Sequence, residues 1–407
     1  MPLHSTLCEI AIRAKSQKRF FLKYILAVKN WQTRFFMSVG SEKTDKLDSE
    51  YGVITEGKAS ILFPKNNKVF YNNVQQFNRD LSIAAIKIWS EIFSEEKQKK
   101  AQQKKDSDIK TQFPRFVPFK FTLSTGLCEQ FVSIVHLLNA PSYKTAYTFT
   151  ILEALAASGL RSIRYAKELS NIKYIVANDL DLDAVNLINR NVEYNELSKD
   201  FVRANQGDAW LVFLNVIYPA PFIDGAVQAV KEGGLLCITC TDLANLTGSN
   251  YPEKCYANYG SIPVKGEFCH EMALRILVHT LSTSAAKYRR HIIPLLCCSI
   301  DFYIRIFVRV ITSPVEPLAK VTGKNSFVPI TGPIVNSNCE YCENKFHVGG
   351  PIWSHSIHDK EFVRRMLEHV KESSKETYQT HSRMLGMLSV VMEELDVPLF
   401  HSLPALA

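Results

Sequence analysis

The stretch that decides the fold covers residues 149–161 and reads FTILEALAASGLR. Its first part, Phe149–Glu153, is a short apolar run typical of a buried strand. Small residues follow and lead into a helical pattern that begins at Gly159. Such a turn between strand and helix lets a ligand approach the backbone amides at the start of the helix. The G-x-G-x-x-G spacing is missing, so the stretch does not specifically indicate a dinucleotide.

Outward from this stretch, apolar runs alternate with amphipathic helical patterns. We expect strands at Phe149–Glu153, Tyr174–Ala177, Phe201–Asn205, Leu211–Ile217 and Leu235–Cys240. We expect helices at Gly159–Glu168, Asp181–Asn195, Phe222–Lys231 and Glu267–Leu281. Strands separated by helices indicate βαβ units and a parallel sheet. Two further runs, Ile292–Ser299 and Phe302–Val310, predict an antiparallel hairpin. The expected fold class is α/β, a doubly wound and mostly parallel sheet with an antiparallel edge hairpin.

The flanking segments carry simpler patterns. Residues 53–63 predict two short strands around a glycine turn, and Phe70–Phe93 has apolar residues on one helical face. The charged tract of residues 95–105 has no apolar face, so we interpret it as a solvated insertion and consider RNA contact as the alternative. Two helices, Asp359–Glu372 and Tyr378–Glu394, are expected near the C-terminus.

Composition limits the class of protein. The chain has 407 residues, of which 46% are hydrophobic and 22% charged, so it can bury a core and is not mainly disordered, collagenous or coiled-coil. It contains no apolar run of about 18 residues, which excludes a membrane span. The net charge of +8 permits a nucleic-acid partner. Several of the 10 cysteines lie inside apolar runs, which indicates reduced thiols and an intracellular location.

The first 40 residues differ from the rest because they hold seven basic residues and a single acid, Glu9. A basic, acid-poor and amphipathic segment is typical of a mitochondrial presequence, and a basic surface helix without a targeting role fits equally well. We expect a nuclear or mitochondrial location, or both.

Polar residues follow successive predicted strands. Asp179 ends the second strand about 20 residues after Gly159, an offset that suits an acid bonded to ribose hydroxyls. Asp208 ends the third strand, where an acid could bind an adenine amine. Each signal alone is weak, because an acid after a strand is often a helix N-cap. Together they favour S-adenosylmethionine over a nicotinamide cofactor.

Longer motifs are similar to those of the tRNA (guanine-N2)-dimethyltransferases that modify position 26. The similar stretches, in order along the chain, are residues 77–80, 155–164, 176–179, 232–242, 270–275 and 349–353. The resemblance runs from about Val53 to about Leu399. It implies a class I methyltransferase fold, S-adenosylmethionine as donor, tRNA as partner, and dimethylation of the exocyclic N2 of guanine 26.

By position, the family's cofactor contacts fall on Arg79, Arg161, Asp179, Asp208 and Ala209. The guanidinium forks of Arg79 and Arg161 suit the carboxylate of the donor's methionine. For the neighbouring Arg164 we expect ion pairs with nearby acids instead.

The family's catalytic loop, Asp-Pro-Tyr/Phe-Gly after the fourth strand, does not occur in this sequence. Topology indicates the same gap, because a parallel crossover needs about a dozen residues. Only Ala209 and Trp210 separate Asp208 from the next apolar run, Leu211–Ile217. Either that run is a remnant of the crossover helix and the strand is missing, or the strand is present without its helix. A deletion of both strand and loop is the simpler account.

No catalytic acid can therefore be named. Tyr218 could stack on a base, but no carboxylate precedes it, and Asp224 is interpreted as a surface or capping residue. The alternative function is a catalytically inactive isoform that binds tRNA or a partner protein without turnover.

Cys339 and Cys342 have the spacing of half a zinc site, which His347, His355 or His358 could complete. We expect a basic leader at 1–50, a methyltransferase domain at 51–312 with a charged insertion near 95–112, and a truncated α+β tRNA-binding domain at 313–407. The basic residues 287–291 could face tRNA phosphates or form a solvated helix end. We expect a monomer.

Overall fold

The computed structural model describes residues 51–64, 71–112, 147–208, 223–249, 251–312, 338, 343–345, 347–395, 397 and 399. Apart from Tyr51, these residues belong to one compact unit, Gly52–Ala407. Several predictions lie outside the described residues: the basic leader, the run Leu211–Ile217, Tyr218, and the possible zinc ligands Cys339 and Cys342.

The stretch that begins at residue 149 forms the first strand of a parallel sheet. Its strands are β3 (Phe149–Glu153), β4 (Ile172–Asp179) and β5 (Val202–Gln206), in that order. The crossovers are α3 (Leu160–Glu168) and α4 (Leu182–Tyr194). The register pairs Glu153 with Ala177 and Asp179 with Gln206, so the carboxyl ends of the strands share one edge. The predicted βαβ units are confirmed.

A second sheet is antiparallel and has the order β6 (Gly234–Cys240), β8 (Tyr303–Thr312), β7 (Arg290–Ile300). β7 and β8 form the predicted hairpin, which turns at Asp301 with a left-handed φ of 49°. The nearby helices are α6 (Ile223–Ala229), α7 (Leu243–Leu246), α8 (Pro252–Tyr259) and α9 (Cys269–Lys287). Residues of α9 and of the strands, such as Leu277 and Ile306, share one buried cluster.

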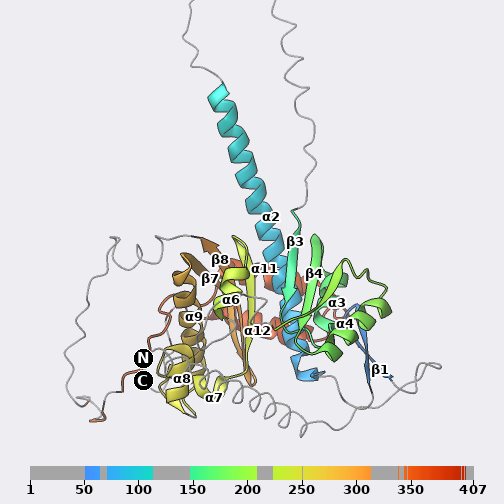
Figure 1. The fold of residues 1–407 in the computed structure, drawn as a ribbon. Coiled ribbons are helices and arrows are strands. Elements are labelled where there is room, and N and C mark those ends of the chain that lie inside the picture. The colour runs from blue at the N-terminus through green and yellow to red at the C-terminus, as the bar shows by residue number, and fades with distance from the viewer. Residues whose placement is uncertain are drawn as a thin grey trace, which may run out of the picture. The chain divides into compact units, whose positions relative to one another are not determined.

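Helix α2 (Gln76–Gln112), preceded by the short helix η1 (Asn73–Gln75), contacts both sheets (Figure 1). The Trp89 ring packs edge-on against Phe149 at the start of β3, with 5.3 Å between centroids, and its Nε1 donates to the Gly233 carbonyl at 3.2 Å, just before β6. Earlier on the helix, Asn78 Nδ2 donates to Thr239 Oγ1 near the end of β6 at 3.1 Å. The starts of β3 and β6 therefore lie at one level of α2.

The sheet differs from the sequence prediction in one respect. Among the described residues β3 pairs with β4 alone and β6 with β8 alone, so there are two sheets of three strands. A single sheet would need a strand between β3 and β6. The chain segment that precedes β6 and α6, residues 209–222, lies outside the described part.

The remaining elements complete the unit. The hairpin β1 (Tyr51–Glu56) and β2 (Ala59–Pro64) turns at Gly57, and helices α11 (Lys360–Glu372) and α12 (His381–Glu393) pack on each other and on α2. These elements were predicted, with ends that differ by a few residues. No helix in the described segments is long and apolar enough to cross a membrane.

The charged tract of residues 95–105 continues α2 instead of forming an irregular insertion. Its two acids face the body of the molecule: Glu95 accepts from Arg365 Nη2 at 2.8 Å, and Glu96 accepts from Arg309 Nη1 at 2.6 Å. Lys, Glu, Gln and Ala are good helix formers, which explains a helix without an apolar face.

Candidate functional site

Asn178, at the end of β4, connects the carboxyl ends of the three parallel strands. Its Nδ2 donates to the carbonyls of Ala154 at 3.0 Å and Gly207 at 2.9 Å. Its Oδ1 accepts from Asn205 Nδ2 at 2.6 Å. The side chain is fully buried, so these bonds fix the three strand ends relative to one another. The sequence analysis noted Asn178 only as a motif member and missed this role.

Asp179 is held by backbone amides on either side of the site. Its Oδ2 accepts from the Ala157 amide at 2.8 Å, and its Oδ1 accepts from the Asp181 amide at 3.1 Å. A carboxylate offers about four lone-pair positions, so further hydrogen bonds to a ligand remain available. The turn needs glycine at its end, because Gly159 has a φ of 75° and an added Cβ would lie 3.2 Å from Ile188.

Glu153, at the end of β3, lies close to both arginines that the resemblance assigns to the cofactor. Arg161 Nε is 3.8 Å from Glu153 Oε1. Burial raises the pKa of Glu153, while the charges of Arg161 and Arg79 act to lower it. Arg161 keeps 25% of its side chain exposed and donates no hydrogen bond to any described residue. Its guanidinium therefore has donors available for an anionic ligand.

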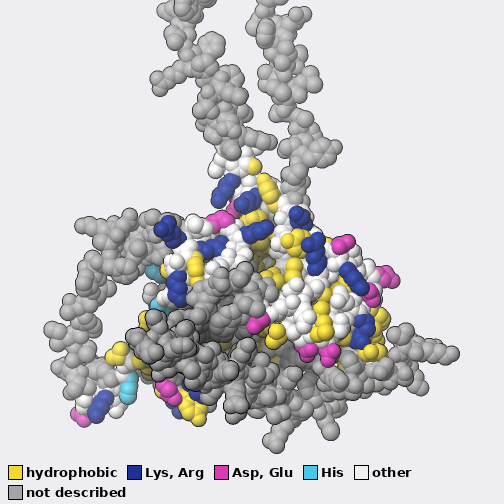
Figure 2. Space-filling view, viewed as in Figure 1, with side chains coloured by type: hydrophobic (Ala, Val, Ile, Leu, Met, Phe, Trp, Pro, Cys, Tyr) yellow, Lys and Arg dark blue, Asp and Glu magenta, His cyan; other side chains and the backbone are white. Residues whose placement is uncertain are grey.

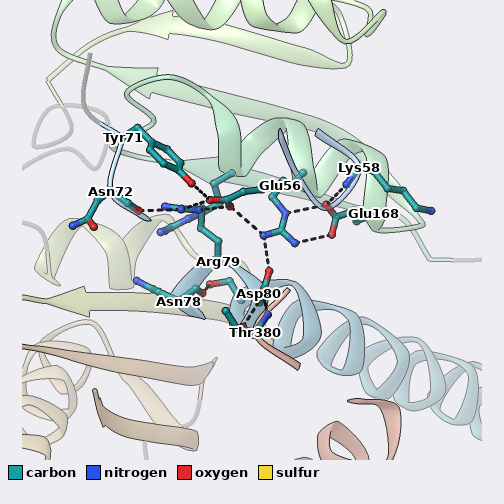
Figure 3. Close-up of polar contacts among 12 residues, drawn as sticks. Glu56, Lys58, Tyr71, Asn72, Asn78, Arg79, Asp80, Glu168 and Thr380 are labelled. Atoms are coloured by element: carbon teal, nitrogen blue, oxygen red, sulfur yellow. Dashed lines mark hydrogen bonds and ion pairs between the residues drawn. The ribbon is translucent and has the colours of Figure 1, made fainter. Parts of the chain in front are cut away.

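Arg79 belongs to a buried network of acids and arginines, drawn in Figure 3. Its Nε donates to Glu56 Oε2 at 2.7 Å, and its Nη2 donates to Glu56 Oε1 and to the Asn72 carbonyl at 3.0 Å. Tyr71 OH donates to Glu56 Oε1 at 2.8 Å. Burial, together with the charge of Glu56, raises the pKa of Tyr71 to about 12, so the phenol stays neutral.

Arg164 forms the ion pairs that the sequence analysis expected. Its Nη1 lies 2.7 Å from Asp80 Oδ1 and 3.5 Å from Glu56 Oε2, and its Nε lies 2.9 Å from Glu168 Oε1. Burial lowers the pKa of Arg164, but the hydrogen bonds and charges of Glu168 and Asp80 outweigh it and raise the pKa above its ordinary value. Asp80 Oδ2 also accepts from the amide and hydroxyl of Thr380, at 3.1 and 2.7 Å.

The structure places the other predicted site residues as follows. Asp208 lies two residues beyond β5 and is half-buried, and Ala209 lies outside the described residues. Asp224, in the first turn of α6, accepts from Ser284 Oγ and from Lys287 Nζ at 3.3 Å, so it joins α6 to α9. In the described segments no three His, Cys, Asp or Glu residues are grouped as metal ligands.

At the edge where β6 and β7 end, the antiparallel sheet is followed by Asp301, directly after β7, and by Asp242, two residues after β6. Asp242 is the more buried of the two and makes local contacts with α7 and α8. It accepts from Tyr259 OH at 3.0 Å and from Asn245 Nδ2 at 2.6 Å. Burial raises its pKa, and these two hydrogen bonds act to lower it. Both bonds join the segments α7 and α8 to the end of β6, so Asp242 anchors local structure.

Three comparisons place the chain among known proteins. Residues 50–407 match the family model "N2,N2-dimethylguanosine tRNA methyltransferase". The tRNA (guanine(26)-N(2))-dimethyltransferase of Schizosaccharomyces pombe is 41% identical over 90% of this chain and 74% of its own length. The mitochondrial enzyme of that name from Saccharomyces cerevisiae is 37% identical over 87% of this chain and 70% of its own length.

The described fold also resembles a solved structure. Trm1 from Pyrococcus horikoshii in complex with S-adenosyl-L-methionine superposes with a TM-score of 0.61 and 26% sequence identity, over 87% of this chain and 86% of that one. The family match covers most of the sequence, and the identities extend over both sheets and the C-terminal helices. This chain belongs to the N2,N2-dimethylguanosine tRNA methyltransferase family.

Proposed function

We propose that the chain transfers methyl groups from S-adenosylmethionine to the exocyclic N2 of guanine 26 in tRNA, and that it adds two. The observation that carries this proposal is the edge where three parallel strands end. There Asn178 fixes the strand ends, Asp179 keeps free lone pairs, and Arg161 has unused donors. Open α/β sheets bind ligands at such carboxyl ends.

The roles of the binding residues follow from their chemistry. Arg79 and Arg161 hold the carboxylate of the donor's methionine, because guanidinium forks match a carboxylate and Arg161 lies beside Glu153 at the end of β3. Asp179 accepts hydrogen bonds from the ribose hydroxyls, and Asp208 and Ala209 bind the adenine. When bound, S-adenosylmethionine supplies an electrophilic methyl group on a sulfonium.

The guanine must be taken out of the base stack before its amine can reach that methyl group. The N2 lone pair is delocalised into the ring, so a stacking residue and a hydrogen-bond acceptor are needed to orient it. The family's tetrapeptide for this task is missing from the sequence, and we assign no catalytic acid.

A basic surface supports the RNA partner. In Figure 2, Lys and Arg side chains gather over the upper part of the molecule, around α2 and the starts of β3 and β4. Lys99, Lys100 and Lys173 are exposed there. Because Glu95 and Glu96 are paired with arginines of the body, the lysines of α2 are left as outward positive charge. Such charge binds phosphate backbones without reading sequence.

The decisive experiment measures S-adenosylmethionine binding by calorimetry and tritiated-methyl transfer to unmodified tRNA on the same purified chain. The control is the same tRNA with adenine at position 26. Binding with transfer only to the guanine-26 tRNA supports the proposal. Binding without transfer to either tRNA would favour the inactive isoform, and no binding would contradict both.

The finer expectations stay proposals of the same kind. We propose the domain limits given above, a monomer, and a nuclear or mitochondrial location; one relative is named mitochondrial. A zinc half-site at Cys339 and Cys342 is proposed from spacing alone, and metal analysis of the purified chain tests it.

A further inference from the structure

We propose that Glu56 is a positioning residue for the methyl-donor site: it holds the Arg79 guanidinium in the orientation that leaves Nη1 for the donor's carboxylate. The inference rests on the proposed function, because Arg79 acts on the donor only if the chain binds S-adenosylmethionine. Glu56 belongs neither to the parallel sheet nor to the motifs that resemble the family.

Glu56 is contacted through both of its carboxylate oxygens. Glu56 ends β1, and its side chain is only 1% exposed. It accepts from Arg79 through both carboxylate oxygens, which is a bidentate pair. Tyr71 OH fixes one of those oxygens at 2.8 Å, and Arg164 Nη1 approaches the other at 3.5 Å. Glu56 is thus held on each side and cannot rotate freely (Figure 3).

Two of the three guanidinium nitrogens of Arg79 are bound by its neighbours. Nε and Nη2 of Arg79 are engaged by Glu56 and by the Asn72 carbonyl. The Tyr71 ring covers the guanidinium face, with Arg79 Cζ at 5.4 Å from the ring centroid. Nη1 donates to none of the residues that the structure describes, and 9% of the side chain remains exposed. One corner of a rigid, planar donor group is therefore left for a ligand.

Arg79 is connected through Glu56 to the helix that carries Arg161. Arg164 Nη1, on α3, approaches Glu56 at 3.5 Å. Arg161 lies three residues earlier on α3, with its Nε 3.8 Å from Glu153 Oε1 at the end of β3. The charge of Arg79 also acts to lower the pKa of Glu153. A ligand carboxylate accepts from both Arg79 and Arg161 only if each fork has the correct orientation.

The network also supplies a matched control. Glu168 is another acid of the same network, with 6% of its side chain exposed against 1% for Glu56, and it pairs with Arg164 at 2.9 Å. It also accepts from the Lys58 amide at 3.2 Å, and it makes no contact with Arg79. A role in stability alone would make the two acids equivalent, whereas a positioning role would separate them.

The test compares Glu56→Gln, Glu168→Gln, Arg79→Ala and the double variant Glu56→Gln/Arg79→Ala in the full chain. Calorimetry gives the dissociation constant for S-adenosylmethionine, and thermal unfolding gives stability. Glutamine keeps the size of Glu56 but turns an amide donor toward Arg79. We expect Glu56→Gln to raise the dissociation constant about tenfold. In turnover, KM for the donor rises by the same factor while kcat stays within about twofold.

The controls decide between positioning and stability. Glu168→Gln should lower the melting temperature yet leave donor affinity within about twofold of the parent chain. The double variant should bind the donor no more weakly than Arg79→Ala, because Glu56 acts through Arg79. Equal donor affinity in Glu56→Gln and the parent chain, or additive losses in the double variant, would overturn the inference alone. A parent chain that binds no S-adenosylmethionine would instead overturn the proposed function.

Discussion

The parallel sheet β3–β4–β5 and the antiparallel sheet β6–β8–β7 both pack on α2, yet they differ in where their strands end. Parallel strands end at one edge, so Glu153, Asp179 and the residues after β5 meet there. In the antiparallel sheet β6 and β7 run opposite to β8, so two strands end at one edge, where Asp242 follows β6 by two residues and Asp301 follows β7 directly. These two acids accept from side chains of neighbouring helices, Tyr259 and Arg383, whereas Asp179 is held by backbone amides. The parallel sheet therefore differs in that all three of its strands end at one edge.

Two buried arginines, one in each region, are held differently. In the parallel region Arg164 is surrounded by Glu56, Asp80 and Glu168. In the antiparallel region the buried Arg305 donates to Thr239 Oγ1 and to Ser82 Oγ, each at 2.8 Å, and no described acid pairs with it. Burial accordingly lowers the pKa of Arg305. Arg164 is therefore neutralised by acids, whereas Arg305 is held by hydroxyl groups; another buried arginine beside the antiparallel sheet, Arg275, pairs with Glu271 at 2.8 Å.

The largest effect should come from removing the central cation of the parallel region. Arg164→Ala removes the cation that pairs with Asp80 and Glu168 and approaches Glu56 at 3.5 Å, and we expect a loss of about 3–5 kcal/mol in the free energy of unfolding. Arg305→Met removes a buried cation that has no acid partner, so the desolvation it relieves offsets two lost hydrogen bonds, and the cost should stay below about 1.5 kcal/mol. Urea unfolding at neutral pH measures the free energy of both variants. Equal losses would show that the two arginines do not differ in their contribution to stability.

Asn178→Ala should come next, because it releases the three strand ends. We expect a loss of roughly 2–3 kcal/mol, since buried carbonyls lose their donors, together with weaker binding of S-adenosylmethionine. Asn245→Ala is the counterpart beside the antiparallel sheet, where Asn245 Nδ2 donates to Asp242 at 2.6 Å. It should cost about 1 kcal/mol and leave donor affinity unchanged. A drop in affinity for Asn245→Ala would show that both sheets shape the donor site.

We expect acid to lower the stability of the folded chain through a histidine of α11. Burial lowers the pKa of His369, on α11, to about 4 from an ordinary value of 6.5, and its Nε2 lies 2.9 Å from Tyr378 OH. The unfolded chain therefore takes up a proton at a higher pH than the folded chain does. Stability is full above pH 6.5 and falls as the pH decreases through 4, by up to about 3 kcal/mol in all.

The variant His369→Gln should flatten this part of the profile of unfolding free energy against pH. His347 is exposed, so His347→Gln should leave the profile as it is. An unchanged slope in His369→Gln would assign the acid sensitivity to other groups, such as the carboxylates of the parallel region.

The sequence predicted what depends on local patterns. Periodicity located the strands and the longer helices of both sheets within a few residues, including the hairpin β7–β8, but not the short helices α7 and α8. It does not indicate the helical end of α2, because that segment has no apolar face and is held by Glu95 and Glu96. The split into two sheets depends on pairing between distant strands, which no local pattern contains.

Some residues of the candidate site could be predicted from the sequence, and others could not. Motifs identified Arg79, Arg161 and Asp179, and the structure places Arg161 beside Glu153 at the end of β3 and Arg79 beside Glu56. Glu56 and Asn178 could not be assigned a role beforehand, because their partners lie far along the chain. Glu56 is 23 residues from Arg79 and 108 from Arg164. Buried polar networks are specified by tertiary contacts, and a sequence shows only their members.

The smallest effect tests whether the two sheets differ anywhere except at their ends. Ile175 in β4 and Ile306 in β8 are both fully buried, so shortening either side chain by one methyl group creates the same kind of cavity. Ile175→Val and Ile306→Val should each cost about 0.5–1.5 kcal/mol in urea unfolding and leave the dissociation constant for S-adenosylmethionine unchanged. Equal costs would mean that the sheet interiors are interchangeable and that function depends on the strand ends. A change in donor affinity for Ile306→Val alone would mean that the antiparallel sheet acts on the site through its core, which contradicts the comparison.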